Sequence, residues 1–157
     1  MTAINHIGLE TEQSLSAAKS LNILLANFQI YYQNLRGLHW NIKGKNFFEL
    51  HLKFEELYTD SQIKIDLIAE RILTLGAHPM HTFEEYLSHA TLRIGKNIHK
   101  DHLAVELIVE NLTALIELER PIASMATEGA DDGTTDMLST FIAEQEKTLW
   151  MFRSWMA

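Results

Sequence analysis

The sequence predicts an all-α fold, a four-helix bundle with one short additional helix. Four long segments place apolar residues at steps of three and four, which is the period of an amphipathic helix. No segment sustains the alternation of apolar and polar residues that is typical of a strand. The 157 residues include only 7 Gly and 2 Pro, and no long polar stretch suggests a disordered arm or a flexible linker.

The first two predicted helices are separated by a short turn. The first covers residues 11–41, and its apolar stripe consists of Leu15, Leu21, Leu25, Phe28, Tyr32, Leu35 and Leu38. After the turn at Lys43-Gly44-Lys45, Asn46 is predicted to cap the second helix, with Glu49 three residues later as in a capping box. This second helix runs for about 30 residues until Gly76 and Pro79 end it.

The remaining helices follow a long connection. Thr82 and Glu85 have capping-box spacing and predict a helix of about two turns within that connection. The third long helix is expected over residues 98–126, with a bend or local loosening at Pro121, and the fourth over residues 134–155. A connection of this length permits a crossover between the second and third long helices.

Composition limits the function. Because 46% of the residues are hydrophobic, residues 1–157 are expected to form one domain with a buried core. The chain has no cysteine, so any metal must be held by imidazole and carboxylate groups. The first 20 residues carry a single lysine and no long apolar run, so we expect neither a signal peptide nor a membrane span, but a cytoplasmic protein. The net charge of −8 disfavours binding to nucleic acid and favours attraction of cations.

The second helix carries two pairs of possible metal ligands. His51 with Glu55, and Asp66 with Glu70, are each four residues apart, so all four positions lie on one side of the helix. The two pairs are about 22 Å apart along the helix axis at ~1.5 Å per residue, which is too far for one ion. Two antiparallel copies of the helix, related by a two-fold axis, would bring the first pair of one subunit beside the second pair of the other.

His39, at the end of the first helix, is the natural third ligand beside His51. Two imidazoles and several carboxylates without a thiolate suit Fe(II), and zinc or manganese could substitute. The simpler interpretation of the same spacing is a solvated or salt-bridged helix face.

The segment LHWNIKGKNFFELHLKFEELYTDSQIKIDLIAERILTLGAHP, from Leu38 to Pro79, strongly resembles the signature of the Dps family of miniferritins. It is similar in His39-Trp40, Gly44, Phe47, His51, Tyr58, Asp66 and the Ala69-Glu70-Arg71 run. The resemblance extends more weakly to ADDGTTDML (130–138) and LWMFRSW (149–155).

This resemblance implies a single ferritin-like (Dps) domain that assembles into a hollow homododecamer with tetrahedral symmetry. It implies an intersubunit di-iron ferroxidase site that oxidises Fe(II), preferably with hydrogen peroxide, and stores ferric mineral as a protection against oxidative damage. Carried over residue by residue, the iron ligands are His39, His51, Glu55, Asp66 and Glu70. Glu55 stands where the family often has Asp.

The resemblance also assigns roles around the site. Trp40 and Tyr58 match aromatic residues that absorb oxidising equivalents, with interface packing as the alternative role of Tyr58. Asp131, Asp132 and Asp136 match the family's three-fold pore, although Asp132 could instead cap the fourth long helix. Glu56 could face the cavity and nucleate mineral, or simply be solvated.

Several alternatives remain at this stage. A di-iron site inside one bundle would need Glu-x-x-His on two helices, and no Glu here has His three residues later. DNA compaction is expected to be weak or absent, and nucleoid association with it, because no Lys or Arg precedes Lys19. A structural bundle without metal is the third alternative. The histidine pairs 78/81 and 99/102 and the group Arg93, Lys96 and Lys100 are expected to be surface residues.

Overall fold

The computed structural model describes residues 2–157. Five helices follow in the order α1 (Thr11–Asn41), α2 (Phe47–Thr74), α3 (Phe83–His89), α4 (Asp101–Glu128) and α5 (Asp132–Met156). The described residues form no strand beyond an isolated bridge between Ile4 and Glu10. The predicted all-α fold with one short extra helix is therefore confirmed.

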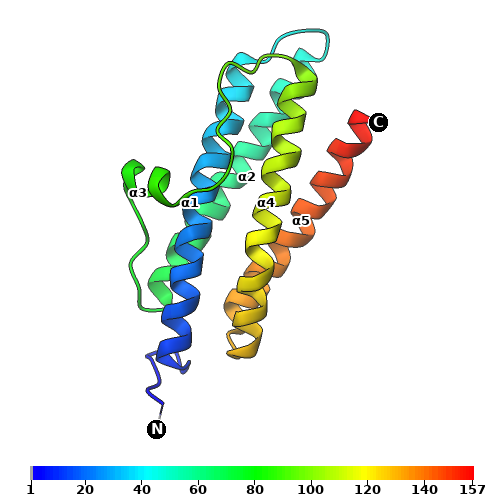
Figure 1. Cartoon of the computed structure of the whole chain (residues 1–157). Coiled ribbons are helices and arrows are strands. Elements are labelled where there is room, and N and C mark those ends of the chain that lie inside the picture. The colour runs from blue at the N-terminus through cyan, green and yellow to red at the C-terminus, as the bar shows by residue number, and fades with distance from the viewer. Residues whose placement is uncertain (1) are drawn as a thin grey trace.

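The four long helices form a bundle with a crossover connection (Figure 1). α1 packs against α2 and α4, and α4 packs against α5. The segment that joins α2 to α4 passes from one end of the bundle to the other along the outside of α1, and α3 lies in it (Figure 1). Because this segment spans the bundle, α2 and α4 run in the same direction, opposite to α1 and α5.

Apolar side chains from all four long helices fill the centre of the bundle. Its largest fully buried members include Leu21, Leu25, Phe28, Leu35, Phe54, Ile68, Ile72, Leu107, Ile108 and Leu112. α3 contributes no buried residue. Leu15 was part of the predicted apolar stripe of α1, but it is exposed. The periodicity therefore identifies the helices well and their buried faces less completely.

The two predicted capping boxes have different outcomes. Thr82 and Glu85 form theirs, since the Thr82 hydroxyl accepts from the Glu85 N–H and the Glu85 carboxylate accepts from the Thr82 N–H. Asn46 is in the N-cap position of α2 but makes no side-chain cap. Its amide donates to Asp101 Oδ2 at 2.7 Å instead, while Glu49 accepts a bond from Trp155. The capping prediction for Asn46 was wrong because long-range partners compete for both side chains.

Two buried asparagines of α1 hold the crossover segment in place. Asn27 Oδ1 accepts bonds from the N–H groups of Thr91 and Leu92 at 2.9 and 3.1 Å. Asn34 donates to the Arg93 carbonyl and accepts from the Gly95 N–H, each at 2.9 Å. These side chains replace the backbone partners that an extended segment lacks.

The helix boundaries lie within three residues of those predicted. α4 begins at Asp101 rather than at residue 98, and α5 begins at Asp132 rather than at residue 134. α4 is continuous across Pro121, so the expected loosening does not interrupt the helix. Gly44, in the turn between α1 and α2, has φ of +115°, a conformation that side-chain-bearing residues rarely adopt.

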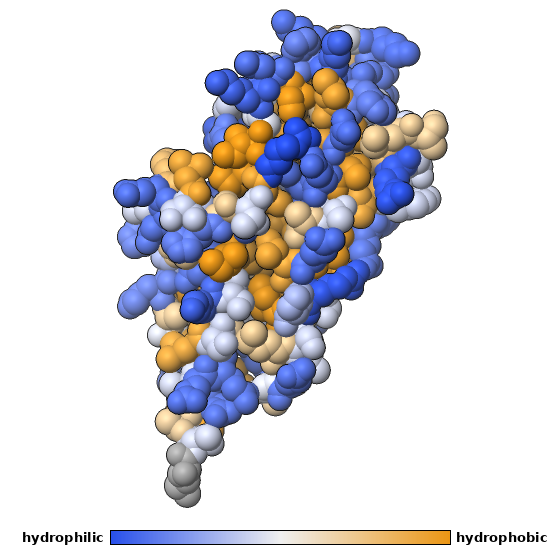
Figure 2. Space-filling view, viewed as in Figure 1, coloured by the Kyte–Doolittle hydropathy of each residue, from blue (hydrophilic) through white to orange (hydrophobic). Residues whose placement is uncertain are grey.

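The surface of the single chain is unusually apolar in places. Figure 2 shows apolar residues gathered over the middle of one face. Large exposed apolar side chains include Phe48, Leu52, Phe83, Leu87 and Trp150. None of the helices between residues 2 and 157 combines the length and the apolar character that a membrane crossing requires. Exposed apolar surface on this scale is typical of a subunit that contacts other chains.

Candidate metal centre

His39 and His51 are brought together by the hairpin of α1 and α2. Their rings are stacked, with centroids 3.7 Å apart and planes inclined by 15°. Each ring is bonded to the backbone of the other residue: His39 Nδ1 lies 2.6 Å from the His51 carbonyl oxygen, and His51 Nδ1 lies 2.8 Å from the His39 carbonyl oxygen. The α1–α2 hairpin thus joins two histidines from different helices by two reciprocal hydrogen bonds.

This reciprocal bonding decides which nitrogen of each ring can bind a metal. A carbonyl oxygen can only accept, so Nδ1 must carry the proton and donate in both rings. The neutral ring then has its lone pair on Nε2. Metal-binding histidines commonly donate their other nitrogen to a carbonyl or carboxylate, which fixes the tautomer and the ring orientation. The backbone of each histidine therefore prepares the other as an Nε2 ligand.

Aromatic residues surround the histidine pair. The Phe47 ring stacks on His51 with centroids 4.9 Å apart, and Tyr58 meets His39 edge-on at 5.3 Å. Trp40 is 58% exposed, and the Arg36 guanidinium lies over its ring at 4.9 Å. Tyr58 therefore contacts a predicted ligand directly. The role predicted for Trp40 remains untested.

The three predicted carboxylate ligands are exposed on α2 and have free oxygens. Among residues 2–157, no hydrogen bond or ion pair involves the carboxylates of Glu55, Asp66 or Glu70. Other acids of the same helix behave differently, since Lys53 binds Glu56 and Lys64 binds Asp60, each at 2.6 Å. These three residues are therefore not salt-bridged within the chain, and the alternative of a solvated face stays a prediction, while Glu56, the possible nucleation residue, is paired.

The single chain does not assemble a complete site. No group of three or more His, Asp or Glu side chains between residues 2 and 157 is close enough to hold an ion. The structure unites His39 with His51, but it leaves Asp66 and Glu70 several helical turns away on α2. This is the geometry expected of a half-site, and completion by a second subunit stays a prediction.

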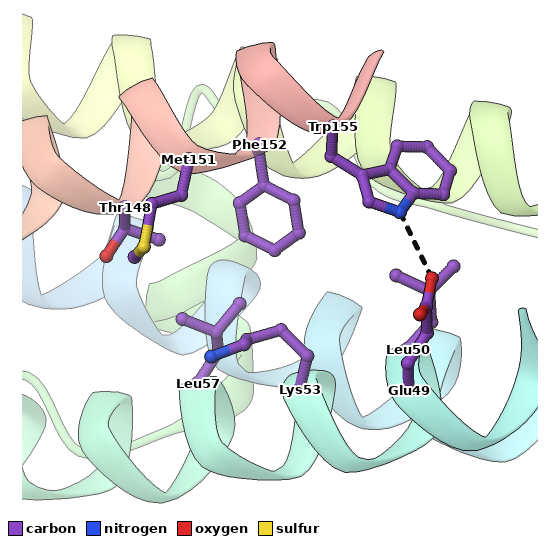
Figure 3. Close-up of a pocket in the computed structure, with 8 residues that line it drawn as sticks. All are labelled: Glu49, Leu50, Lys53, Leu57, Thr148, Met151, Phe152 and Trp155. Carbon is purple, nitrogen blue, oxygen red and sulfur yellow. Dashed lines mark hydrogen bonds between the residues drawn. The ribbon is translucent and has the colours of Figure 1, made fainter.

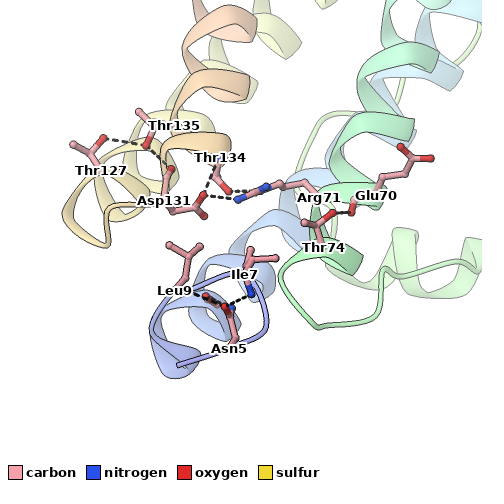
Figure 4. A network of polar contacts seen from close by, with 11 residues as sticks. Asn5, Ile7, Leu9, Glu70, Arg71, Thr74, Thr127, Asp131, Thr134 and Thr135 are labelled. Carbon is pink, nitrogen blue, oxygen red and sulfur yellow. Dashed lines mark hydrogen bonds and ion pairs between the residues drawn. The ribbon is translucent and has the colours of Figure 1, made fainter. Parts of the chain in front are cut away.

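The acidic residues of the α4–α5 turn have divided roles. Asp131 is buried, and its Oδ1 accepts bonds from the Thr134 N–H at 3.0 Å and from Arg71 Nη2 at 2.5 Å (Figure 4). The cap of α5 is therefore Asp131, and its assignment to Asp132 was wrong by one residue. Asp132 and Asp136 are exposed, so the predicted pore acids now differ in environment.

The other histidines and basic residues are mostly at the surface, as predicted. His81 Nδ1 lies 3.1 Å from the carbonyl oxygen of Pro79, within its own turn. His102 is exposed at the start of α4. Arg93 forms an ion pair with Glu110 at 2.6 Å, which reduces the free charge of the basic group.

A polar cluster inside the bundle was missed by the sequence reasoning. Lys64 and Glu119 are almost fully buried, and Gln145 donates to Glu119 Oε1 at 2.8 Å. Burial raises the pKa of Glu119 to about 8, although Gln145, Lys64 and Arg120 oppose the shift. Burial also raises the pKa of Tyr31, and Asp60 and Glu119 add to that effect. Lys64 and Glu119 continue the apolar spacing of their helices, and that was the available signal.

An apolar groove lies between α2 and α5 (Figure 3). It has a volume of about 270 Å³, and Trp155 Nε1 donates across it to Glu49 Oε1 at 3.2 Å. Leu50, Leu57, Met151 and Phe152 are among its lining residues. None of the predicted iron ligands lines it, so this groove is separate from the candidate metal centre.

Comparisons with known proteins agree with this architecture. The chain matches the family model of the ferritin-like domain over residues 18–157. It is 40% identical to a DNA protection during starvation protein of Porphyromonas gingivalis, over 94% of this chain and 93% of the relative. The corresponding protein of Brevibacillus brevis is 34% identical, over 94% and 99%.

Solved structures show the same similarity in three dimensions. The crystal structure of a Dps protein from Vibrio cholerae, described as a member of the ferritin-like diiron-carboxylate superfamily, has a TM-score of 0.97 and 48% identity. The match covers 100% of this chain and 99% of that one. A Dps structure from Bacillus brevis has a TM-score of 0.90 and 34% identity, over 93% and 98%. Fold, sequence and helix order together assign this chain to the Dps family of ferritin-like proteins.

Proposed function

We propose that this protein is a ferroxidase and an iron-storage miniferritin, whose di-iron sites are shared between two subunits. The observation that carries the proposal is the reciprocal bonding of His39 and His51, which prepares two Nε2 ligands on one chain. The carboxylates of Glu55, Asp66 and Glu70 lie on the neighbouring helix without a protein partner. Imidazole and carboxylate ligands suit iron, and also zinc or manganese.

A two-fold axis across α2 supplies the missing half of each site. His39, His51 and Glu55 come from one subunit, and Asp66 and Glu70 come from its mate. Exposed apolar residues on α2, such as Leu52 (57%), Ile63 (58%) and Leu67 (43%), provide the surface that such contact would bury. The same two-fold axis generates two equal sites per dimer.

The proposed reaction pairs two one-electron donors with one two-electron oxidant. Two ferrous ions reduce one hydrogen peroxide, and two further water molecules complete two ferric oxyhydroxide units with release of four protons. No hydroxyl radical is released when both electrons come from iron. Trp40 and Tyr58 supply electrons when only one ferrous ion is present. This chemistry protects the cell from oxidative damage.

The mineral is stored in the cavity of a homododecamer with tetrahedral symmetry. Asp132 and Asp136, both exposed at the start of α5, are the acids that draw Fe(II) through a three-fold pore. Asp131 holds the turn that carries them. The net charge of −8 favours cations and disfavours DNA, so we propose weak DNA binding or none. We also propose that the protein is cytoplasmic.

Two measurements test this function. Light scattering after size exclusion should give the mass of twelve subunits, and a monomer or simple dimer would refute the cage. Absorbance in the near ultraviolet after addition of Fe(II) and peroxide follows the oxidation itself. The double variant His51→Ala with Glu70→Ala should lose most of this rate, because each site then lacks one ligand from each side.

A matched control is available on α4. His102 and Glu106 are exposed residues of the same types, outside the proposed site. The double variant His102→Ala with Glu106→Ala should oxidise iron as fast as the parent. Equal rates in both double variants would show that the ligand assignment is wrong.

A further inference from the structure

A buried ammonium group lies between two carboxylates that reach the surface, since the side chains of Asp60 and Glu144 are 53% and 56% exposed. Lys64 is 3% exposed, and its Nζ lies 2.6 Å from Asp60 Oδ2 and 2.6 Å from Glu144 Oε2. The same nitrogen lies 5.2 Å from the centre of the Phe141 ring. None of these four residues belongs to the proposed iron site. The ammonium group of Lys64 is thus the positive charge that lies between α2 and α5 at this position.

Two buried oxygens near this cation have no partner. Glu119 Oε2 and Gln145 Oε1 make no hydrogen bond within residues 2–157, although Glu119 is fully buried and Gln145 is 5% exposed. Gln145 lines a cavity of about 20 Å³ together with Asp60, Lys64 and Glu144. A space of this size accommodates one water molecule or one small ion. A buried oxygen in this position is suited to accept a proton, a water molecule or a cation.

Without its ammonium group, this cluster would offer oxygen ligands from three helices. Asp60 is on α2, Glu119 on α4, and Glu144 and Gln145 are on α5. Carboxylate and amide oxygens bind hard divalent cations, and helix bundles place carboxylate metal sites in their cores. In the described structure, no three acids between residues 2 and 157 converge closely enough to hold an ion, so a cation would have to draw them together. The ammonium group keeps the carboxylates neutralised and occupies the position between them.

We propose that Lys64 is a specificity residue, which excludes divalent cations from the bundle interior and so leaves iron to the sites between subunits. The second half of this statement rests on the proposed function. The first half does not, because it concerns a cluster within one chain. It predicts that loss of the ammonium group converts the cluster into a divalent-cation site.

The test is a Co(II) titration of Lys64→Met, made in the background His51→Ala with Glu70→Ala. This background removes the proposed intersubunit site, so the result does not depend on whether that site is correct. Metal analysis after equilibrium dialysis should find about one more Co(II) per subunit than in the same background with Lys64. Co(II) should also raise the melting temperature of the Lys64→Met protein.

Lys53→Met is the matched control. Lys53 is also on α2 and also bound to a carboxylate at 2.6 Å, but its side chain is 43% exposed, against 4% for that of Lys64. This variant should bind no additional Co(II). Adding Glu119→Gln to Lys64→Met should weaken the new site by about tenfold or more, because the carboxyl of Glu119 can release its proton to bind an ion, whereas an amide cannot become a charged ligand.

A folded Lys64→Met protein that binds no extra Co(II), and whose melting temperature does not respond to Co(II), would overturn the proposal. If the variant does not fold alone, refolding in Co(II) replaces the titration. Recovery of the helical circular dichroism signal then supports the proposal, and failure to recover it counts against it.

Discussion

At the scale of single residues, the candidate site depends on backbone as much as on side chains. His39 and His51 each donate Nδ1–H to the carbonyl of the other. A substitution of one histidine therefore also removes a bond from the other residue's backbone. The two residues are therefore linked through backbone bonds as well as through their stacked rings.

The buried carboxyl of Glu119 leads to a prediction about pH. Its pKa is raised to about 8, so the folded state holds a proton that the unfolded chain releases at about its ordinary pKa of 4.5. The stability that comes from this proton is complete at low pH and is lost as the pH rises from about 4.5 through about 8. Glu119→Gln removes this dependence. It should stabilise the protein by about 2–4 kcal/mol at pH 8 relative to its effect at pH 4.5.

Urea unfolding of parent and variant at both pH values measures the effect. Protonation gives Glu119 Oε2 a hydrogen that it can donate. Gln145 Oε1 is a buried acceptor to which no group donates. An amide at position 119 provides such a donor at every pH. A difference between parent and variant that did not change with pH would contradict the shifted pKa.

At the scale of secondary structure elements, α5 begins at a carboxylate with two functions. Asp131 caps the helix and also binds Arg71 of α2, while the neighbouring Asp132 is exposed and makes neither contact. Asp131→Ala should therefore lower the free energy of unfolding by about 2–4 kcal/mol, because a cap is lost and a partly buried charge is left unpaired. Asp132→Ala should change it by less than about 0.5 kcal/mol.

Thermal unfolding of the two alanine variants gives this comparison directly. Iron uptake provides a second readout, since Asp132 is a proposed pore acid and Asp131 holds the turn. Equal destabilisation by both substitutions would contradict the assignment of the cap to Asp131 alone. A stable Asp132→Ala protein with slower uptake would support the division of roles between the two acids.

The same scale shows what sequence could and could not predict. Apolar periodicity located four long helices, and Thr82 with Glu85 located α3, because these signals are local. Asn46 failed as a cap because Asp101, 55 residues later, binds its amide. The buried positions of Lys64 and Glu119 were missed because their partners are on other helices. Local signals thus predicted where the helices lie. Contacts between helices, which the sequence does not show, determine which polar side chains are buried.

At the scale of the whole molecule, the sequence names candidate ligands but says little about their geometry. Spacing on α2 and the family resemblance named His39, His51, Glu55, Asp66 and Glu70, and axial distance indicated that one chain cannot unite them. The structure adds the stacked histidine pair, which no spacing rule contains. It also leaves Asp66 and Glu70 apart from that pair, and under the proposed function a second subunit would complete the centre.

If each iron site is divided between two subunits, a subunit with a defect in the histidine half should complement a subunit with a defect in the Asp66–Glu70 half. In a mixed dimer of His51→Ala and Glu70→Ala, one site would contain both substitutions and the other would contain neither. Random mixing gives about half of the dimers one subunit of each variant, and each of these mixed dimers has one intact site of two. Co-refolding of the two inactive variants should therefore restore about a quarter of the parental ferroxidase rate.

The matched control mixes two variants with defects on the same half-site. His39→Ala and His51→Ala subunits, refolded together, would give sites that always lack one histidine, so their rate should stay at the level of either variant alone. Stopped-flow absorbance after addition of Fe(II) and peroxide measures both mixtures at equal protein concentration. Recovery in both mixtures, or in neither, would mean that the centre is not divided between subunits as proposed, because only a site built from two chains distinguishes defects on opposite halves from defects on the same half.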